Sequence, residues 1–89
     1  MENSPKRIRL EKQPEKYLRK APEHIRKRLY AALEQVALFQ GDIVKLAGKD
    51  NLYRYKMPKY RIIFRYVNGA IEIIVIEINT RTNIKYREV

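Results

Sequence analysis

The chain has 89 residues, a length that predicts a single domain over residues 1–89 with a modest hydrophobic core. Hydrophobic residues make up 45% of it, which argues against disorder, and the absence of Cys excludes disulfides and cysteine-based metal sites. Lys and Arg number 20 against 10 Asp and Glu, and the net charge of +10 is expected to attract a polyanion: a nucleic acid, an anionic membrane or an acidic protein. With a single His there is no His-rich metal site, so no metal or other cofactor is expected.

The first residues, MENSPKRIRL, lack the apolar core of a signal peptide. No segment approaches the ~18 consecutive apolar residues of a membrane span. Both predicted helices also have apolar stripes that suit a protein core better than a lipid surface. We therefore expect a cytoplasmic protein with no membrane partner.

The first half of the chain predicts one strand and two helices. Charged and apolar side chains alternate in KRIRLEK, as in a half-buried strand. Two prolines, each followed by Glu, mark helix starts, and apolar residues three and four positions apart give the second helix a core face. Gly41 is expected to cap that helix in a left-handed conformation. The predicted elements are a strand over residues 6–12 and helices over 14–21 and 22–40.

The second half changes to a period of two, which predicts three strands. Pro58-Lys59 separates the first two, and Asn68-Gly69, typical of a type I′ turn, joins the last two. The order β-α-α-β-β-β predicts an α+β fold, a small antiparallel-rich twisted sheet with two helices packed on one face. The strands are expected over residues 52–57 (LYRYKM), 60–67 (YRIIFRYV) and 70–78 (AIEIIVIEI).

Strand alternation sorts the cations of this half onto one face. Arg54 and Lys56 share one side of their strand, and Arg61 and Arg65 share one side of the next. We expect all four to lie on the sheet face that the helices leave open. An antiparallel sheet often has one solvated, charged face, which is a sufficient explanation without any ligand.

A face of one sign only is less easily explained, since like charges across neighbouring strands repel each other. Acidic residues are expected not to pair there, because Glu72 and Glu77 are an odd number of residues apart and are predicted on opposite faces. A phosphate backbone would compensate the repulsion, because the planar Arg fork matches phosphate oxygens. Exposed Tyr side chains would stack on unpaired bases.

The order of elements and several motifs resemble the RelE/ParE superfamily of bacterial toxins over nearly the whole chain. The similarity lies in GKDNLYRYKM and YRIIFRY, in the NG turn with its hydrophobic strand, and in INTR followed by a Tyr. This resemblance implies the toxin of a type II toxin–antitoxin system, neutralised by a cognate antitoxin protein. RelE-like members cleave mRNA on the ribosome, whereas ParE-like members poison DNA gyrase.

Matched position by position, the resemblance implies a catalytic set that favours the RelE-like branch. Alternation and the basic tail add further expected RNA contacts. The chain departs from the family in having Arg54 where Lys is frequent, and in lacking an obvious His or Glu for acid–base chemistry. A gyrase inhibitor without nuclease activity and a catalytically silent binding module are the alternatives. The expected catalytic residues are Lys56, Arg61, Arg81 and Tyr86, and the expected RNA contacts are Arg54, Arg65, Lys85 and Arg87.

The resemblance implies cleavage by the RNA's own 2′-hydroxyl, which attacks the adjacent phosphate. Arg61 and Arg81 would stabilise the charge that builds on the phosphoryl oxygens. Lys56 would take the 2′ proton as a neutral amine, or would simply contact a phosphate. Tyr86 would stack on a base or assist proton transfer at the leaving oxygen. The expected partners are thus mRNA and the ribosome, besides the antitoxin.

Overall fold

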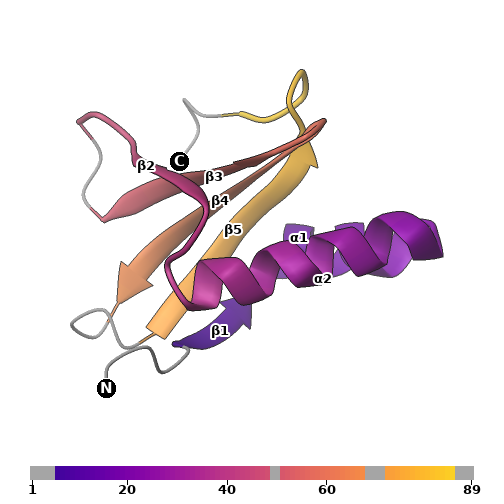
Figure 1. Cartoon of the computed structure of the whole chain (residues 1–89), viewed down its shortest axis with the longest axis horizontal. Coiled ribbons are helices and arrows are strands. Elements are labelled where there is room, and N and C mark those ends of the chain that lie inside the picture. Colours follow the sequence, from indigo (N-terminus) through magenta and orange to yellow (C-terminus); the bar gives the residue numbers. More distant parts are fainter. Residues whose placement is uncertain (1–5, 49–50, 68–71, 86–89) are drawn as a thin grey trace.

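The computed structural model describes residues 6–48, 51–67 and 72–85, and it has two helices packed on one face of a five-stranded sheet (Figure 1). The elements are β1 (Arg7–Leu10), α1 (Lys12–Lys20), α2 (Glu23–Ala37), β2 (Asp42–Lys45), β3 (Leu52–Met57), β4 (Tyr60–Val67) and β5 (Glu72–Thr80). The strand order is β1-β5-β4-β3-β2, with β1 parallel to β5 and the other neighbours antiparallel. This confirms the predicted α+β class and adds β2, which the sequence assigned to no element. The predicted Asn68-Gly69 turn lies outside the described residues.

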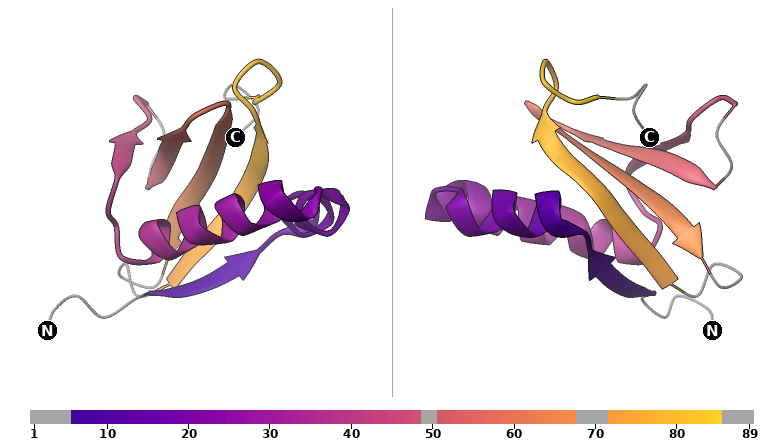
Figure 2. Two further views of the ribbon diagram at one scale, coloured as in Figure 1. Left: turned by 45° about the vertical axis from the view of Figure 1, so that its right-hand side comes forward. Right: turned by 180° about the vertical axis from the view of Figure 1, so that it is seen from behind.

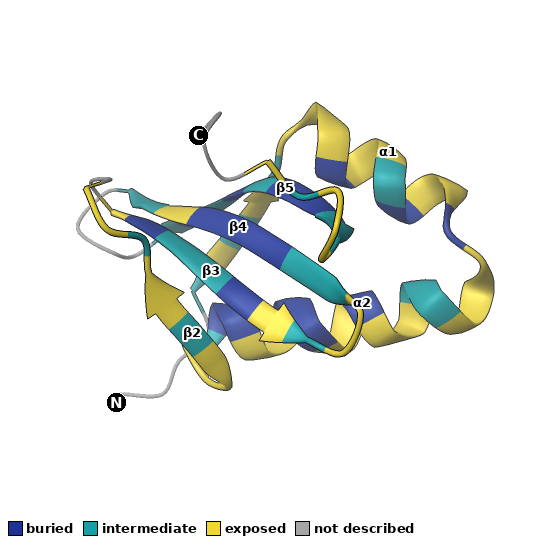
Figure 3. Ribbon diagram, turned by 90° about the horizontal axis from the view of Figure 1, so that it is seen from above, coloured by how far each residue is buried: buried dark blue, intermediate teal, exposed yellow. Residues whose placement is uncertain are grey.

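The hydrophobic core lies between the two helices and the sheet. Leu18 of α1 and Val36 of α2 are buried against Ile62 and Phe64 of β4, the central strand. Figure 3 shows the buried middle of β4 in dark blue. Each such side chain contributes about 1.5–3 kcal/mol by leaving water, so the core fixes which face of the sheet the helices cover.

Both helices begin close to the predicted prolines. α1 starts at Lys12, before Pro14, which still lies in the first turn, where the backbone N–H has no partner within the helix. α2 starts at Glu23, and Pro22 takes the extended conformation of the N-cap position, with φ −58° and ψ 154°. Proline therefore marks both helix starts, although neither boundary coincides with the predicted one.

The end of α2 differs from the prediction, because the left-handed residue that closes the helix is Phe39 and not Gly41. Phe39 has φ 55°, and its N–H donates to the Val36 carbonyl at 2.9 Å. The N–H of Gln40 donates to the Gln35 carbonyl at 2.8 Å, which completes a Schellman motif. The predicted extent to Gln40 was therefore too long, and the cap is made by an aromatic residue.

Gly41 is still required, for the path that leads into β2. It has φ +93°, and a Cβ built on it would lie 2.7 Å from both Gln35 Oε1 and Tyr55 Cε1. We expect Gly41→Ala to lower the free energy of unfolding by about 2–3 kcal/mol, through backbone strain and overlap together. Urea denaturation measures the loss.

Gly48→Ala is the matched control for Gly41→Ala. Gly48 also has a positive φ, +73°, but its added Cβ would meet no atom within 4 Å. We expect a loss of only about 1 kcal/mol there, from the backbone alone. Equal losses at the two glycines would contradict the close approach at Gly41.

The side chain of Gln13 hydrogen-bonds to the backbone of β5 just beyond the part that pairs with β1. β1 pairs only with the first part of β5, from Glu72 to Val75. Beyond it, the Gln13 amide donates to the Ile78 carbonyl at 2.8 Å and accepts from the Ile78 N–H at 2.9 Å. Gln13 thus replaces one residue of a neighbouring strand, while β1 and β2 remain as the short outer strands of the sheet (Figure 2).

Candidate functional site

The sheet face opposite the helices carries the predicted cations. The alternate residues of β3 and β4 pack into the core, so the residues between them project to the other, open face. The structure therefore places Arg54, Lys56, Arg61 and Arg65 on one face, as the alternation predicts. They are not equally exposed: Lys56 and Arg65 are exposed, whereas Arg54 and Arg61 are half-buried.

Lys56 and Arg61 lie with Arg81 near the β3–β4 turn, and Arg54 lies two residues before Lys56 on the same face of β3. Lys56 lies directly opposite Arg61 in the pairing of β3 with β4. The Arg81 N–H donates to the Lys59 carbonyl in the turn at 3.0 Å, which brings this exposed residue to the same end of the sheet. We call Arg54, Lys56, Arg61 and Arg81 the cationic cluster.

Arg65 shares the open face but not the cluster. It lies opposite Leu52 and Ile74, at the other end of β4. Four residues along a strand separate it from Arg61, a distance of about 13 Å. Any contact of Arg65 with a polyanion therefore concerns a different phosphate from the one nearest Arg61.

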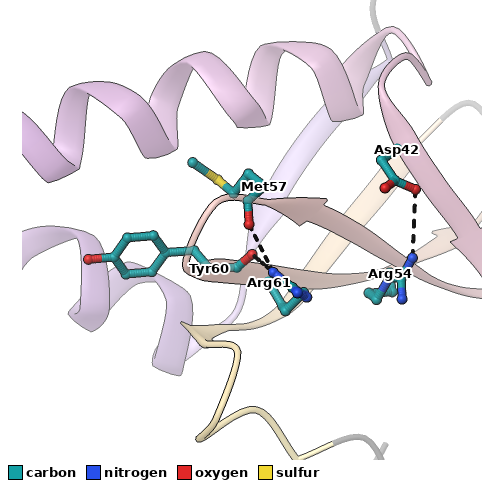
Figure 4. A network of polar contacts seen from close by, with 5 residues as sticks. All are labelled: Asp42, Arg54, Met57, Tyr60 and Arg61. Atoms are coloured by element: carbon teal, nitrogen blue, oxygen red, sulfur yellow. Dashed lines mark hydrogen bonds and ion pairs between the residues drawn. The ribbon is translucent and has the colours of Figure 1, made fainter.

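The Arg61 guanidinium is held in place by the backbone of the turn. Its Nη1 donates to the carbonyl oxygens of Met57 and Tyr60, each at 2.8 Å (Figure 4). A guanidinium has five N–H donors, so Nε and Nη2 are left for an anion. The backbone thus orients a fixed positive charge toward the open face without neutralising it.

Arg54 is paired within the protein, which the sequence did not predict. Its Nη2 lies 3.7 Å from Oδ1 of Asp42 on β2, and its side chain is only 24% exposed (Figure 4). The buried Nε has no hydrogen-bond partner. Asp42 also lies directly opposite Lys56, so a carboxylate stands beside two members of the cationic cluster.

The prediction that the open face carries only positive charges is therefore wrong. Asp42 offsets Arg54 at the β2 edge, and at the other edge Glu72 lies 3.8 Å from Nε of Arg9 on β1. Among the described residues, no ion pair links Lys56, Arg61 or Arg81 to a carboxylate. Lys56, Arg61 and Arg81 are thus the members of the cationic cluster that have no ion pair among the described residues.

The prediction that Glu72 and Glu77 lie on opposite faces is also wrong. A register shift between Ile63 and Phe64 places Glu77 opposite Ile63, and Glu72 lies opposite Val67. Both carboxylates therefore share the open face, because the irregularity inserts one residue into the alternation of β5. Five residues of strand still separate them by about 16 Å, so they form no paired-carboxylate site.

Glu77 anchors the segment that follows β5. It is only 9% exposed, and its carboxylate accepts from the backbone N–H of Lys85 at 3.3 Å and from the Asn79 amide at 3.4 Å. The tail therefore folds back onto the open face as far as Lys85. The predicted site residues Tyr86 and Arg87 lie outside the described residues.

Aromatic side chains gather on the opposite, helix-covered side. The Tyr53 ring lies 5.5 Å from Phe39 and 5.0 Å from Tyr66, between ring centroids. Burial, with a smaller contribution from Tyr53, raises the pKa of the Tyr66 hydroxyl to about 12. The Tyr66 hydroxyl is therefore neutral at physiological pH. Both strand tyrosines pack against the core and do not share the face of the cations.

Sequence reasoning missed Asp42 and Glu77 as parts of this face. Asp42 lies in a strand of only four residues. Ile43 is the one side chain of this strand that packs against the core, so the strand is too short to show a recognisable alternation of apolar and polar residues. The role of Glu77 depends on the irregularity in β5, which the apolar run around it conceals. Neither residue carries a motif.

The part of the chain that the structure describes has neither a group of metal-ligating side chains nor a membrane-spanning helix. Residues 6–48, 51–67 and 72–85 contain no group of three or more His, Cys, Asp or Glu side chains that could hold a metal ion. Neither α1 nor α2, the helices of the described part, is long and apolar enough to cross a membrane.

Comparisons with known proteins complete the picture of the fold. No protein-family model matches the chain, and no curated protein matches its sequence. Among solved structures, a RelB–RelE antitoxin–toxin complex from Methanococcus jannaschii matches with 31% identity and a TM-score of 0.65, over 83% of this chain and 91% of that one. A RelE–RelB complex from Pyrococcus horikoshii matches with 21% identity and a TM-score of 0.70, over 91% of this chain and 100% of that one.

The isolated RelE toxin of Escherichia coli has the same fold. It matches with 21% identity and a TM-score of 0.71, over 93% of this chain and 92% of that one. At this identity the likeness concerns the fold alone, whereas the 31% match over most of both chains shows the family. The chain belongs to the RelE-like toxins of type II toxin–antitoxin systems, within the RelE/ParE superfamily.

Proposed function

We propose that this toxin is an endoribonuclease that cleaves mRNA during translation on the ribosome. The observation that carries the proposal is the Arg61 guanidinium, which two backbone carbonyls hold at 2.8 Å. Arg61 lies opposite Lys56, and the backbone of Arg81 is bonded to the same turn. Fixed cations stabilise charge that develops in a transition state better than mobile ones, because they need no reorganisation. A phosphodiester is the substrate that suits such a cluster.

The proposed reaction is an in-line attack of the 2′-oxygen on the adjacent phosphorus. The 2′-O–P bond forms, the P–O5′ bond breaks, and the products are a 2′,3′-cyclic phosphate and a 5′-hydroxyl. Arg61 and Arg81 stabilise the phosphoryl oxygens, where negative charge increases most. The 2′ proton leaves to a base, and the 5′-oxygen receives a proton as it departs.

Lys56 is the proposed base, since it lies opposite Arg61 on the open face and is exposed. Tyr86 is proposed to stack on a base or to protonate the leaving oxygen. Arg54, Arg65, Lys85 and Arg87 are proposed to contact neighbouring phosphates.

We also propose a cognate antitoxin as the protein partner. The solved complexes from M. jannaschii and P. horikoshii pair RelE with RelB, and the present chain carries a net charge of +10. An acidic or amphipathic segment would cover part of this charge when it binds.

Mapping of RNA ends tests the proposed activity. The protein would be added to ribosomes programmed with a defined mRNA, and the 5′ ends would be mapped by primer extension. Cuts in register with codons are expected, and they should disappear when the ribosomes are omitted. A change in plasmid supercoiling without cuts would identify a gyrase inhibitor, and neither effect would identify a silent binding module.

Lys56→Met separates proton transfer from phosphate contact. We expect single-turnover cleavage to fall by about 10²–10⁴-fold, the usual contribution of a general base, while binding to the ribosome weakens only a few-fold. Lys45→Met, an exposed cation on β2, is the matched control and should leave both quantities nearly unchanged. Equal losses of cleavage and binding in Lys56→Met would remove the proton-transfer role.

Asp42→Asn tests whether the carboxylate competes with phosphate for Arg54. We expect the affinity for RNA to rise roughly fivefold at 0.1 M salt, the effect of about one additional phosphate contact. The fold should be unaffected, because a partly exposed ion pair contributes at most about 1 kcal/mol.

Glu34→Gln, which removes the same charge from the exposed surface of α2, should change the RNA affinity much less. A fall in affinity for Asp42→Asn would mean that Asp42 positions Arg54 for the RNA instead of competing with it. Fluorescence anisotropy with a labelled oligonucleotide measures both variants.

A further inference from the structure

A second basic and aromatic surface lies on the helix side of the same hairpin. It is an open groove of about 370 Å³ between α1, the start of α2 and β4. None of the described residues that line it is acidic. Its lining includes the side chains of Gln13, Lys16, Tyr17, Lys20, Ile25 and Tyr60.

We propose that this groove binds a nucleotide of single-stranded RNA, with its base against the tyrosine rings and its phosphates on the lysines. The inference rests on the proposed function only in taking RNA as the polyanion. It assigns binding to a place that the proposed cleavage chemistry does not use.

The charges of the groove come from one side of α1. Lys16 and Lys20 are four residues apart, so they lie one turn above each other, and both are exposed. A negatively charged chain that follows this side of the helix would meet both ammonium groups. The groove lacks the carboxylate that offsets Arg54 on the open face.

The flat surfaces of the groove come from two tyrosines that are held in place. The Arg28 guanidinium lies 5.9 Å from the centre of the Tyr60 ring, and its Nη2 donates to the Pro58 carbonyl at 3.3 Å. Tyr17 packs against the core, and burial, with a smaller contribution from Tyr60, raises the pKa of its hydroxyl. Its O–H is therefore available as a donor at neutral pH.

The groove and the cationic cluster meet at the tip of the hairpin. Tyr60 and Arg61 are consecutive residues of β4 on opposite faces, and Figure 4 shows the Tyr60 ring directed away from the Arg61 guanidinium. Lys59 in the turn between β3 and β4 is exposed and adds a charge between the two surfaces. One strand of RNA that crosses the tip would thus meet cations continuously from one face to the other.

RNA explains the groove better than an acidic peptide does. Lysines alone would suit either polyanion, but stacking on aromatic rings contributes about 1–3 kcal/mol per base, and a carboxylate has no aromatic face that could stack in this way. The combination of a cationic rim with aromatic walls is the usual composition of a site for single-stranded nucleic acid.

The test measures binding of a fluorescent 2′-O-methyl RNA hexamer, which cannot undergo 2′-hydroxyl attack. Failure of cleavage and failure of binding are therefore distinguishable. The double variant Lys16→Met/Lys20→Met should lose about 25-fold in affinity at 0.1 M salt, and the slope of log K against log salt should fall by about 1.4, for two single-strand phosphate contacts. The matched control is Lys27→Met/Lys45→Met, which removes two exposed lysines outside the groove.

A cross-linking experiment locates the base independently of any variant. A hexamer with 4-thiouridine, irradiated on the wild-type protein, should attach to peptides that contain Tyr17 or Tyr60. Equal losses in the two double variants, or cross-links that fall only elsewhere, would overturn the proposal. So would tighter binding of a polyglutamate peptide than of the RNA, with the same sensitivity to Lys16 and Lys20, because the groove would then recognise a protein.

Discussion

Replacement of Arg61 by Ala should lower the single-turnover rate of RNA cleavage by about 100-fold or more, the usual loss when one preorganised donor is removed from a transition state. The guanidinium that disappears is the one that the turn carbonyls of Met57 and Tyr60 hold in place. Those carbonyls belong to half-exposed residues, so water can replace the lost hydrogen bonds. The protein should therefore stay folded while the rate falls.

Two further variants distinguish three contributions to the rate: the charge at position 61, the planar shape of the guanidinium, and the general attraction of a basic protein for RNA. Arg61→Lys keeps the charge but loses the planar fork, and we expect an intermediate rate. Arg7→Ala removes a cation from the same face at the distant strand β1, and it should leave the rate at saturating RNA unchanged. Thermal melting of all three proteins measures folding. If Arg7→Ala were as harmful as Arg61→Ala, general attraction and not a positioned charge would explain the activity.

Phe64→Ala should have the largest effect on stability, a loss of about 3–5 kcal/mol in the free energy of unfolding. Phe64 is fully buried on the central strand, and its ring stacks on Tyr53 with 5.6 Å between centroids. A protein of this length is expected to have only about 4–13 kcal/mol of stability, so the variant would be close to unfolding. Urea denaturation of purified protein measures the change.

The control for Phe64→Ala is Tyr30→Ala on α2. Tyr30 is also aromatic, but it is 50% exposed, and Ala is the better helix former. We expect its effect to stay within about 1 kcal/mol. A comparable loss at both positions would mean that the core does not depend on the ring of Phe64.

The sequence predicted the open face of β3 and β4 because alternation along these strands is regular. From Leu52 to Met57 and from Tyr60 to Ile63, every second residue packs into the core, without an insertion. The alternation of side chains along the strands is therefore sufficient to place Arg54, Lys56 and Arg61 on the open face. The helix starts were predicted to within two residues, since Pro14 and Pro22 lie close to them.

The features that the sequence did not reveal depend on contacts between distant residues. β2 exists because its four residues pair with β3, and that pairing brings Asp42 to Arg54. The register shift in β5 is concealed by a run that is apolar on both sides, so Glu77 was assigned to the wrong face. The position of the Arg61 guanidinium depends on two carbonyl oxygens, which no side-chain pattern encodes.

The two hydrogen bonds between the Gln13 side chain and the Ile78 backbone have a consequence for self-association. An uncovered strand edge is a template on which a second copy of the same chain can add and begin an aggregate. The Gln13 amide occupies both backbone groups of Ile78 and so covers the edge of β5 at this residue, beyond the part that pairs with β1. The outermost strands are then only four residues long, so they offer a second copy of the chain little edge on which to pair.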